Sequence, residues 1–208
     1  MNDNSCNTTG TVTTQDYRLQ EEIVFDGNTV RSVTDSSQTE PLSYVSAQQT
    51  TAEFKSDQRT EQVVSVFDVA KYILELMNEQ CTTMKLHKLL YYCQAWNLVW
   101  EDKKLFKEKI EAWANGPVVR ELFNYHKGMY WISKNNLTLG NSSKLSQLQK
   151  DNVKSVISFY GGRTSQWLID QTHSEKPWRD ARKGLAPNER GDSEITSQSM
   201  FDYFSSLK

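Results

Sequence analysis

The chain has 208 residues, which is enough for one hydrophobic core with an appendage. Its formal net charge of −2 and mean hydropathy of −0.68 give no global reason to expect nucleic acid or an anionic membrane as a partner. No apolar run approaches the roughly eighteen residues that a membrane span needs. The start, MNDNSCNTTG, lacks the basic and apolar stretches of a secretory signal.

Three cysteines, Cys6, Cys81 and Cys93, form an odd set without CxxC spacing. We interpret them as reduced thiols of a cytoplasmic protein, not as a disulfide frame or a zinc site. Cys93 falls among the apolar positions of a predicted helix, so we expect it in the core.

Residues 1–62 are rich in Thr, Ser and Gln and hold ten acidic and four basic side chains, a net charge of −6. This composition buries too little apolar surface to offset the entropy of ordering, so it predicts a polar, acidic and partly flexible extension. One segment differs, because β-branched residues flank a DGN turn within Ile23–Val33. That pattern predicts a β-hairpin.

The folded part is predicted to begin near Val63. Ser65 and Asp68 have the spacing of a capping box, with Asp68 in place of the usual Glu. Behind them, apolar residues at helical spacing predict a first helix that ends around residues 78–80. Its apolar stripe comprises Phe67, Ala70, Ile73, Leu74 and Met77.

A second helix is predicted over Thr82–Trp100, capped by Thr82 or Thr83. Its apolar residues cover more than one face, which is typical of a central helix with neighbours on several sides. We expect Glu101–Lys109 to be a loop with its charged side chains in water. Ile110–Trp113 alternates and predicts a short strand or an extended entry to the following turn.

Asn115, Gly116 and Pro117 predict a turn in which the proline takes the first position of a third helix. That helix should end near Gly128. The next residues, Met129–Ile132, are apolar but form only a short run.

A fourth helix is predicted over Leu145–Tyr160, closed by Gly161-Gly162. Thr164 is expected to cap a fifth helix, and Thr196 or Ser197 a last one. The inward residues of the fourth helix are predicted to be Leu145, Leu148, Val153, Val156, Ile157 and Phe159. The pattern predicts a mainly α fold, with residues 63–208 forming one compact helical domain that holds at most a small β element.

The three histidines, His87, His126 and His173, have no metal-ligand spacing, so we predict no metal site. We expect surface or core-edge positions for the two on helices. His173 near Glu175 is the one possible acid–base pair, but no nucleophile stands beside it. No phosphate-binding loop is present, so we predict no nucleotide cofactor. An enzyme using these two residues remains the least favoured alternative.

Basic and aromatic residues alternate at Lys85, His87, Lys88 and Tyr92, a pattern that nucleic-acid-binding helices also show. Four of the six tryptophans, Trp96, Trp100, Trp113 and Trp131, occur close together around one predicted turn. Such aromatics belong either to the core or to an interface, since Trp and Tyr dominate binding hot spots.

With these residues in view, the chain resembles the Panacea domain, the SocA-like, phage-associated antitoxin family. The resemblance runs from about Val66 to the C-terminus. It rests on the strings VFDVAKYIL, TTMKLHKLLYYCQAWNLVW, FKEKIEAWANGPVVRELFNYHKG and LIDQTHSEKPWRDAR. The residues that match the family's motifs are Lys85, Lys88, Asn115, Gly116, Pro117, His173, Pro177 and Trp178, whereas His87 stands where Gln is common.

The resemblance implies a cytoplasmic, non-enzymatic protein of bacterial or prophage origin that neutralises a toxin encoded nearby by binding it. An adaptor that delivers the toxin to the protease ClpXP and a DNA-binding regulator or phage accessory protein remain open as alternatives. We expect a patch around the ANGP turn to contact the toxin, with Tyr92, Trp96, Trp100, Trp113, Asn115 and Pro117 as its candidate residues. The acidic extension either folds on a basic toxin or acts as a solvating linker.

Overall fold

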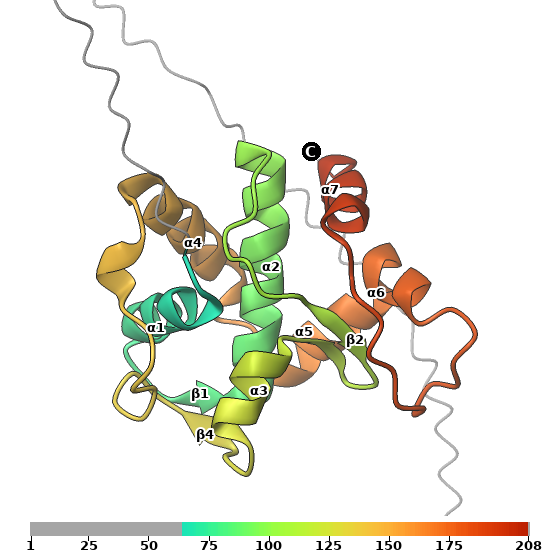
Figure 1. The fold of residues 1–208 in the computed structure, drawn as a ribbon, viewed down its shortest axis with the longest axis horizontal. Coiled ribbons are helices and arrows are strands. Elements are labelled where there is room, and N and C mark those ends of the chain that lie inside the picture. Colours follow the sequence, from blue (N-terminus) through green and yellow to red (C-terminus); the bar gives the residue numbers. More distant parts are fainter. Residues whose placement is uncertain (1–63, 208) are drawn as a thin grey trace, which may run out of the picture. The chain divides into compact units, whose positions relative to one another are not determined.

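A computed structural model describes residues 64–207 of the chain (Figure 1). The predicted hairpin at Ile23–Val33 and the predicted domain start at Val63 lie outside the described residues. The mainly α prediction is confirmed, because seven α-helices and two small two-stranded sheets make up the regular structure of the described part. Its elements are α1 (Val66–Met77), β1 (Cys81–Thr82), α2 (Thr83–Glu101), β2 (Glu111–Trp113), β3 (Gly116–Val118), α3 (Arg120–His126), β4 (Trp131–Ile132), the 3-10 helix η1 (Ser142–Lys144), α4 (Gln147–Tyr160), α5 (Ser165–Ser174), α6 (Lys176–Ala181) and α7 (Ser197–Ser205).

Helix α1 begins with the predicted capping box. The Asp68 amide donates to Ser65 Oγ at 3.3 Å, and the Ser65 amide donates to Asp68 Oδ2 at 3.1 Å. The other carboxylate oxygen, Asp68 Oδ1, accepts from the Asn141 amide at 2.7 Å. Asp68 therefore fixes both the start of α1 and the loop that precedes η1. The helix ends at Met77, and its C-cap residue, Asn78, has a left-handed φ of 55°.

Helix α2 is the central element of the described chain (Figure 1), with α1, α4, α5 and α7 all packed against it. Thr82 caps it by accepting from the Lys85 amide at 3.1 Å. Buried side chains occur on all sides of the helix, as its sequence predicts. They are Leu86, His87, Lys88, Leu89, Leu90, Tyr91, Tyr92, Cys93, Gln94, Ala95, Asn97 and Leu98.

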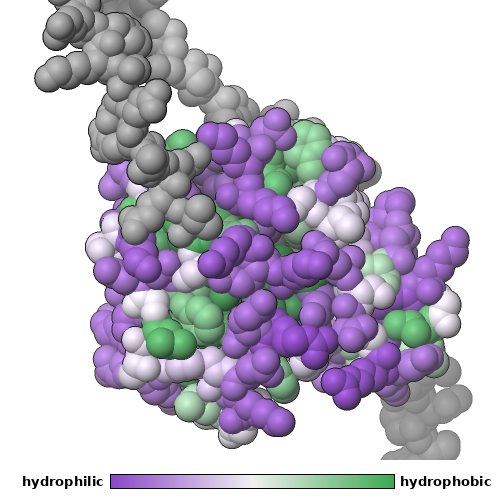
Figure 2. Space-filling model, in the orientation of Figure 1, coloured by the Kyte–Doolittle hydropathy of each residue, from purple (hydrophilic) through white to green (hydrophobic). Residues whose placement is uncertain are grey.

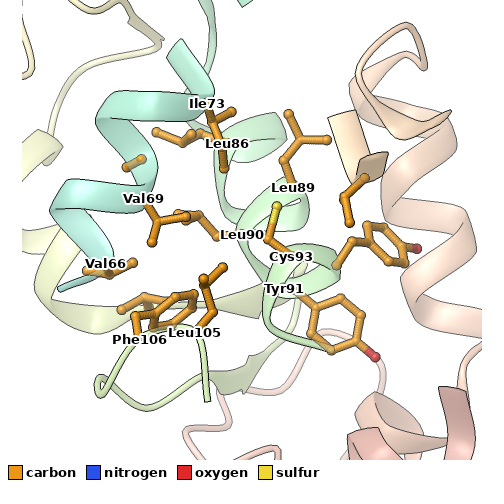
Figure 3. Packing of buried hydrophobic residues seen from close by; sticks show 14 of the residues in the cluster. Val66, Val69, Ile73, Leu86, Leu89, Leu90, Tyr91, Cys93, Leu105 and Phe106 are labelled. Atoms are coloured by element: carbon orange, nitrogen blue, oxygen red, sulfur yellow. The ribbon is translucent and has the colours of Figure 1, made fainter. Parts of the chain in front are cut away.

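The core between α1 and α2 is built from aliphatic side chains (Figure 3). Val66, Val69 and Ile73 of α1 face α2, where Leu86 and Leu90 lie opposite them (Figure 3). The predicted core position of Cys93 is confirmed, because its side chain is buried in the same cluster. On the other side of α2, Tyr91 and Tyr92 pack edge to face against Phe204 of α7; their ring centroids lie 5.8 and 6.1 Å from that of Phe204.

The expectation that Glu101–Lys109 is a solvated loop is wrong for two of its residues. Leu105 and Phe106 are almost fully buried beside α1 and α2 (Figure 3). The buried amide of Gln94 holds their backbone, because its Oε1 accepts from both amides at 2.9 and 3.1 Å. Its Nε2 donates to the Phe106 carbonyl at 3.2 Å. A polar side chain of α2 thus satisfies the backbone that enters the core.

The expected place of Pro117 at the start of a helix is wrong. Strands β2 and β3 form an antiparallel hairpin with Trp113 opposite Gly116, and Pro117 lies within β3. Helix α3 begins three residues later, at Arg120. Proline has no backbone N–H, but an N–H at this position would point away from β2, so the strand pairing loses no hydrogen bond. The predicted strand at Ile110–Trp113 is confirmed as β2, and the segment before α7 lies along it, with the Ile195 amide donating to the Ile110 carbonyl at 2.8 Å.

Helices α4, α5 and α7 have the predicted N-caps or lie within one or two residues of the predicted starts. Thr164 and Thr196 cap α5 and α7 through their hydroxyls, and Ser146 forms a capping box with Gln149 at the start of α4. Two predicted inward residues of α4 are wrong, since Leu148 is 56% exposed and Phe159 is 49% exposed. The inward face of α4 is made by Val153, Val156 and Tyr160.

Candidate functional site

The ANGP hairpin is held from beneath by Lys88. The Lys88 ammonium lies in the core and donates to the Pro117 carbonyl at 3.1 Å, with Met84 Sδ at 3.4 Å. Gly116, with φ of 99°, passes directly over this side chain, and a Cβ there would lie 2.5 Å from Lys88 Cε. A glycine is therefore required where the hairpin crosses the lysine. Burial also lowers the pKa of Lys88 to about 7.

The C-terminal motif closes on the same hairpin from the other side. The His173 ring stacks on Trp178, with centroids 4.1 Å apart and planes 13° apart. Trp178 Nε1 donates to the Trp113 carbonyl at 3.0 Å, and Arg182 Nη1 donates to the Ala112 carbonyl at 3.0 Å. Trp178 of α6 and Arg182, the residue after this helix, thus hold strand β2 in place. Lys88 of α2 and Trp178 of α6, which are far apart in the sequence, therefore both hold the hairpin.

Glu175 is a buried carboxyl at the end of α5. The Tyr92 hydroxyl donates to its Oε1 at 3.0 Å. Burial raises the pKa of Glu175 to about 7, because an unpaired carboxylate is unfavourable in this apolar setting. Within the described chain, Glu175 Oε2, the neighbouring Tyr91 hydroxyl and His173 Nε2 are buried without a hydrogen-bond partner. No hydrogen bond joins His173 to Glu175 in the described part, so the geometry does not form the acid–base pair that the sequence left open.

His87 and His126 are buried, which corrects the expectation of surface or core-edge positions. Their Nε2 atoms lie 2.8 Å apart, and the Val119 amide donates to His87 Nδ1 at 3.2 Å. His87 Nδ1 must therefore carry the lone pair, so His87 Nε2 holds the proton and donates to His126 Nε2. Burial lowers the pKa of both rings and keeps them neutral. Among residues 64–207, no three His, Cys, Asp or Glu side chains gather as a metal site would require.

The helical pattern of Lys85, His87, Lys88 and Tyr92 does not form a basic surface. His87, Lys88 and Tyr92 point into the core because α2 is surrounded by other elements. Only Lys85 is partly exposed, and its ammonium donates to the Gly161 carbonyl at 2.6 Å, which ties α2 to the end of α4.

Three of the exposed large apolar residues of the described chain follow one another at the connection from α3 to β4. Met129, Tyr130 and Trp131 are 42%, 70% and 49% exposed and follow one another in the chain. We call these three residues the Met129–Trp131 patch. Tyr130 and Trp131 touch edge to face, with centroids 5.2 Å apart. On the face of the domain shown in Figure 2, hydrophilic residues dominate and apolar ones occupy small separate areas.

A groove of about 460 Å³ adjoins this patch. Trp131 forms part of its wall, together with residues from the end of α1, from β1, from the start of α2 and from the α4–α5 turn. The other lining residues are Met77, Glu79, Gln80, Cys81, Thr82, Lys85, Ile157, Gly161, Thr164 and Ser165.

Comparison with protein families gives one match. Residues 86–179 match the family model described as the antitoxin SocA-like, Panacea domain. Over these residues the chain is similar to the Panacea family. We refer to this range as the Panacea region. No curated protein and no solved structure matches the chain.

The match confirms the resemblance predicted from the sequence, over a narrower range than the predicted one. It supports an antitoxin role in general terms, implies a toxin as partner and suggests a non-enzymatic protein. Neither the family description nor the described residues provide support for ClpXP or DNA as partners. Among the described residues, no helix is long and apolar enough to cross a membrane.

The Panacea region contains all six residues that the sequence suggested for partner binding, in different environments. Tyr92 and Pro117 are buried, whereas Asn115 is exposed at the hairpin tip. The three tryptophans are partly buried. Trp96 stacks on Trp100 with centroids 5.6 Å apart, and Trp113 packs against Phe123 with centroids 4.7 Å apart. Contact of these residues with a toxin stays a prediction.

Trp131 is one of the four tryptophans that the sequence predicts to cluster, whereas no binding role was predicted for Met129 or Tyr130. The available signal was the run MYWI directly after Gly128, with no helical spacing to bury it. Four consecutive large apolar residues in so short a connection cannot all face inward. Ile132 is buried, and the other three are exposed.

Proposed function

We propose that this protein is an antitoxin that neutralises its cognate toxin by direct contact, and that the Met129–Trp131 patch is part of the contact surface. The observation that carries the proposal is the exposure of three consecutive large apolar side chains, at 42%, 70% and 49%, on a Panacea region. Contiguous exposed apolar patches mark interaction sites, and Trp and Tyr supply much of the binding free energy at protein interfaces.

The position of the patch supports this proposal. Backbone hydrogen bonds anchor it, since the Thr83 amide donates to the Tyr130 carbonyl at 3.0 Å and the Met129 amide donates to the His126 carbonyl at 2.8 Å. The side chains are therefore presented by a backbone that is already ordered. Less conformational entropy is lost on binding than for a flexible loop.

The ANGP hairpin is the second surface to test. Asn115 is exposed at its tip, and Trp113 is partly exposed under the Arg120 guanidinium, whose carbon lies 5.4 Å from the ring centroid. Tyr92 is buried in α2 and Pro117 is buried within β3. Their replacement would act through the fold, so they are poor probes of contact.

The test is co-expression of the full chain with the product of the adjacent open reading frame, with growth and co-purification scored together. The informative variants are Trp131→Ala and Tyr130→Ser in the patch, and Asn115→Ala at the hairpin. Leu148→Ser is the matched control, because it also removes a largely exposed apolar side chain, but on α4. All four changes remove exposed side-chain atoms and leave the core intact.

We expect the wild type and Leu148→Ser to restore growth and to co-purify with the toxin, and the patch variants to lose both. Loss with Asn115→Ala but not with the patch variants would move the contact to the hairpin. Rescue accompanied by disappearance of the toxin protein would indicate degradation and contradict neutralisation by stable contact. A neighbouring product that is harmless and does not bind would refute the antitoxin assignment.

A further inference from the structure

The pairing of β1 with β4 determines which way the backbone of Trp131 points. Thr82 lies opposite Trp131 and Cys81 opposite Ile132, and the Thr83 amide donates to the Tyr130 carbonyl at 3.0 Å. In an antiparallel pair, hydrogen-bonded and non-hydrogen-bonded residue pairs alternate. Cys81 and Ile132 therefore form the hydrogen-bonded pair, and Thr82 and Trp131 the other. The N–H and C=O of Trp131 consequently point away from β1.

These two outward groups are open. Within residues 64–207, neither the amide nor the carbonyl of Trp131 has a hydrogen-bond partner. The next outward residue, Ser133, is closed, because its amide donates to Asn136 Oδ1 at 2.6 Å and its carbonyl accepts from the Leu137 amide at 3.1 Å. In Figure 1, β4 lies on the outer side of β1 at the periphery of the domain. The open stretch of this edge is centred on Trp131.

The side chains at this edge are unusual for an unpaired strand. Proteins usually protect such edges with Lys, Pro or bulges, because an open edge recruits other strands. Here the open residue is a tryptophan that is 49% exposed, and it follows a tyrosine that is 70% exposed. Together these residues provide a backbone that can pair and an apolar surface that a paired segment would cover.

We propose that the toxin contributes an extended segment that adds to β4 as a third strand. Its backbone would form hydrogen bonds with the N–H and C=O of Trp131. Its residue opposite Trp131 would be aromatic or β-branched, since such cross-strand pairs are favourable. This inference rests on the proposed antitoxin function and specifies the kind of toxin segment that the Met129–Trp131 patch takes.

The test measures amide hydrogen exchange in the full chain, alone and in complex with the product of the adjacent open reading frame. In the free protein the Trp131 amide should exchange at close to its intrinsic rate. In the complex it should exchange at least about 100-fold more slowly, because strand addition supplies an acceptor. The Ile132 amide is the internal control. It already faces Cys81 across the β1–β4 pair and should exchange slowly in both states.

A side-chain variant separates backbone pairing from simple apolar contact. Trp131→Thr keeps the amide and favours a strand, but removes the aromatic surface. We expect the dissociation constant to rise about tenfold or more, while the amide of residue 131 stays protected in the saturated complex. Fast exchange at Trp131 in a tight complex would overturn strand addition and leave the antitoxin proposal standing.

Two further outcomes would also overturn the inference. Slow exchange at Trp131 in the free protein that becomes fast on dilution would show that a second copy of this chain occupies the edge. A neighbouring product that does not bind at all would overturn the antitoxin proposal together with the inference. Failure of the inference alone is thus distinguishable from failure of the proposed function.

Discussion

Replacement of Gly116 with alanine should destabilise the domain by about 2–5 kcal/mol. The backbone there has φ of 99°, which disfavours an L side chain by about 1–2 kcal/mol. The new Cβ would also lie 2.5 Å from Lys88 Cε and 3.1 Å from Thr172 Oγ1. Lys88 cannot move aside freely, because it is fully buried and bonded to the Pro117 carbonyl. Overpacking of this kind costs about 1–3 kcal/mol more.

Gly128→Ala is the matched control for the backbone cost. Gly128 has φ of 88°, and no heavy atom lies within 4 Å of the position of its added Cβ. It should lose only the backbone part, about 1–2 kcal/mol. Unfolding in urea measures both free energies of unfolding.

A double variant tests whether Lys88 is the cause. Lys88→Ala removes the Cε and Nζ atoms that the new side chain meets, so Gly116→Ala should cost less in that background than in the wild type. The expected coupling is about 1–3 kcal/mol. The explanation would be refuted if Gly116→Ala were no more costly than Gly128→Ala, or if the two changes at residues 88 and 116 were additive.

The remaining predictions also concern stability. Glu175 has a pKa of about 7 in the folded protein, compared with its ordinary value of 4.5. Between these two pH values the folded protein holds a proton that the unfolded chain has lost. Stability should therefore fall by about 3 kcal/mol between pH 4.5 and 7, and Glu175→Gln should remove this decline in urea titrations. Lys88 has a pKa of about 7 in the folded protein, compared with its ordinary value of 10.5. Between these two pH values the unfolded chain holds a proton that the folded protein has lost, so the free energy of unfolding should rise by about 5 kcal/mol from pH 7 to 10.5. This rise should be absent in Lys88→Met. Asp68→Ala removes the carboxylate that accepts from the Ser65 and Asn141 amides, and should lower the free energy of unfolding by about 2 kcal/mol. Trp131→Ala, at a side chain that is 49% exposed, should lower it by about 1 kcal/mol.

Helix starts were predictable from the sequence because their determinants are local. The Ser65–Asp68 capping box and the Thr164 and Thr196 caps each depend on side chains within three residues of the amide they satisfy. The central place of α2 was predictable for a related reason. A helix that is apolar on most of its circumference needs neighbours on several sides.

The hairpin and the loop before it were not predictable in the same way, since distant residues determine them. A proline after Asn-Gly favours a helix start, but the pairing of Glu111 with Val118 and the Lys88 bond to the Pro117 carbonyl hold it in a strand. Leu105 and Phe106 lie in a lysine-rich segment. Their inward path places both side chains in the core, and the buried Gln94, eleven and twelve residues away, accepts from their amides.

The same distinction between local and distant determinants applies to the residues of the candidate site. Motif residues such as Lys88, Pro117 and Trp178 were identifiable by their types and spacing, but their burial or support role depends on tertiary packing. The exposure of Met129 and Tyr130 depends on the pairing of β4 with β1. That pairing joins residues about fifty positions apart, and no local pattern encodes it.

The most direct test of the central claim is the affinity of the purified full chain for the product of the adjacent open reading frame, measured by titration calorimetry. The wild type and Leu148→Ser should bind with the same dissociation constant. Trp131→Ala should bind about tenfold more weakly or worse, although it still unfolds in one cooperative transition in urea. Equal affinities for Trp131→Ala and the wild type would contradict a contact through the Met129–Trp131 patch, and no binding by the wild type would contradict the antitoxin function itself.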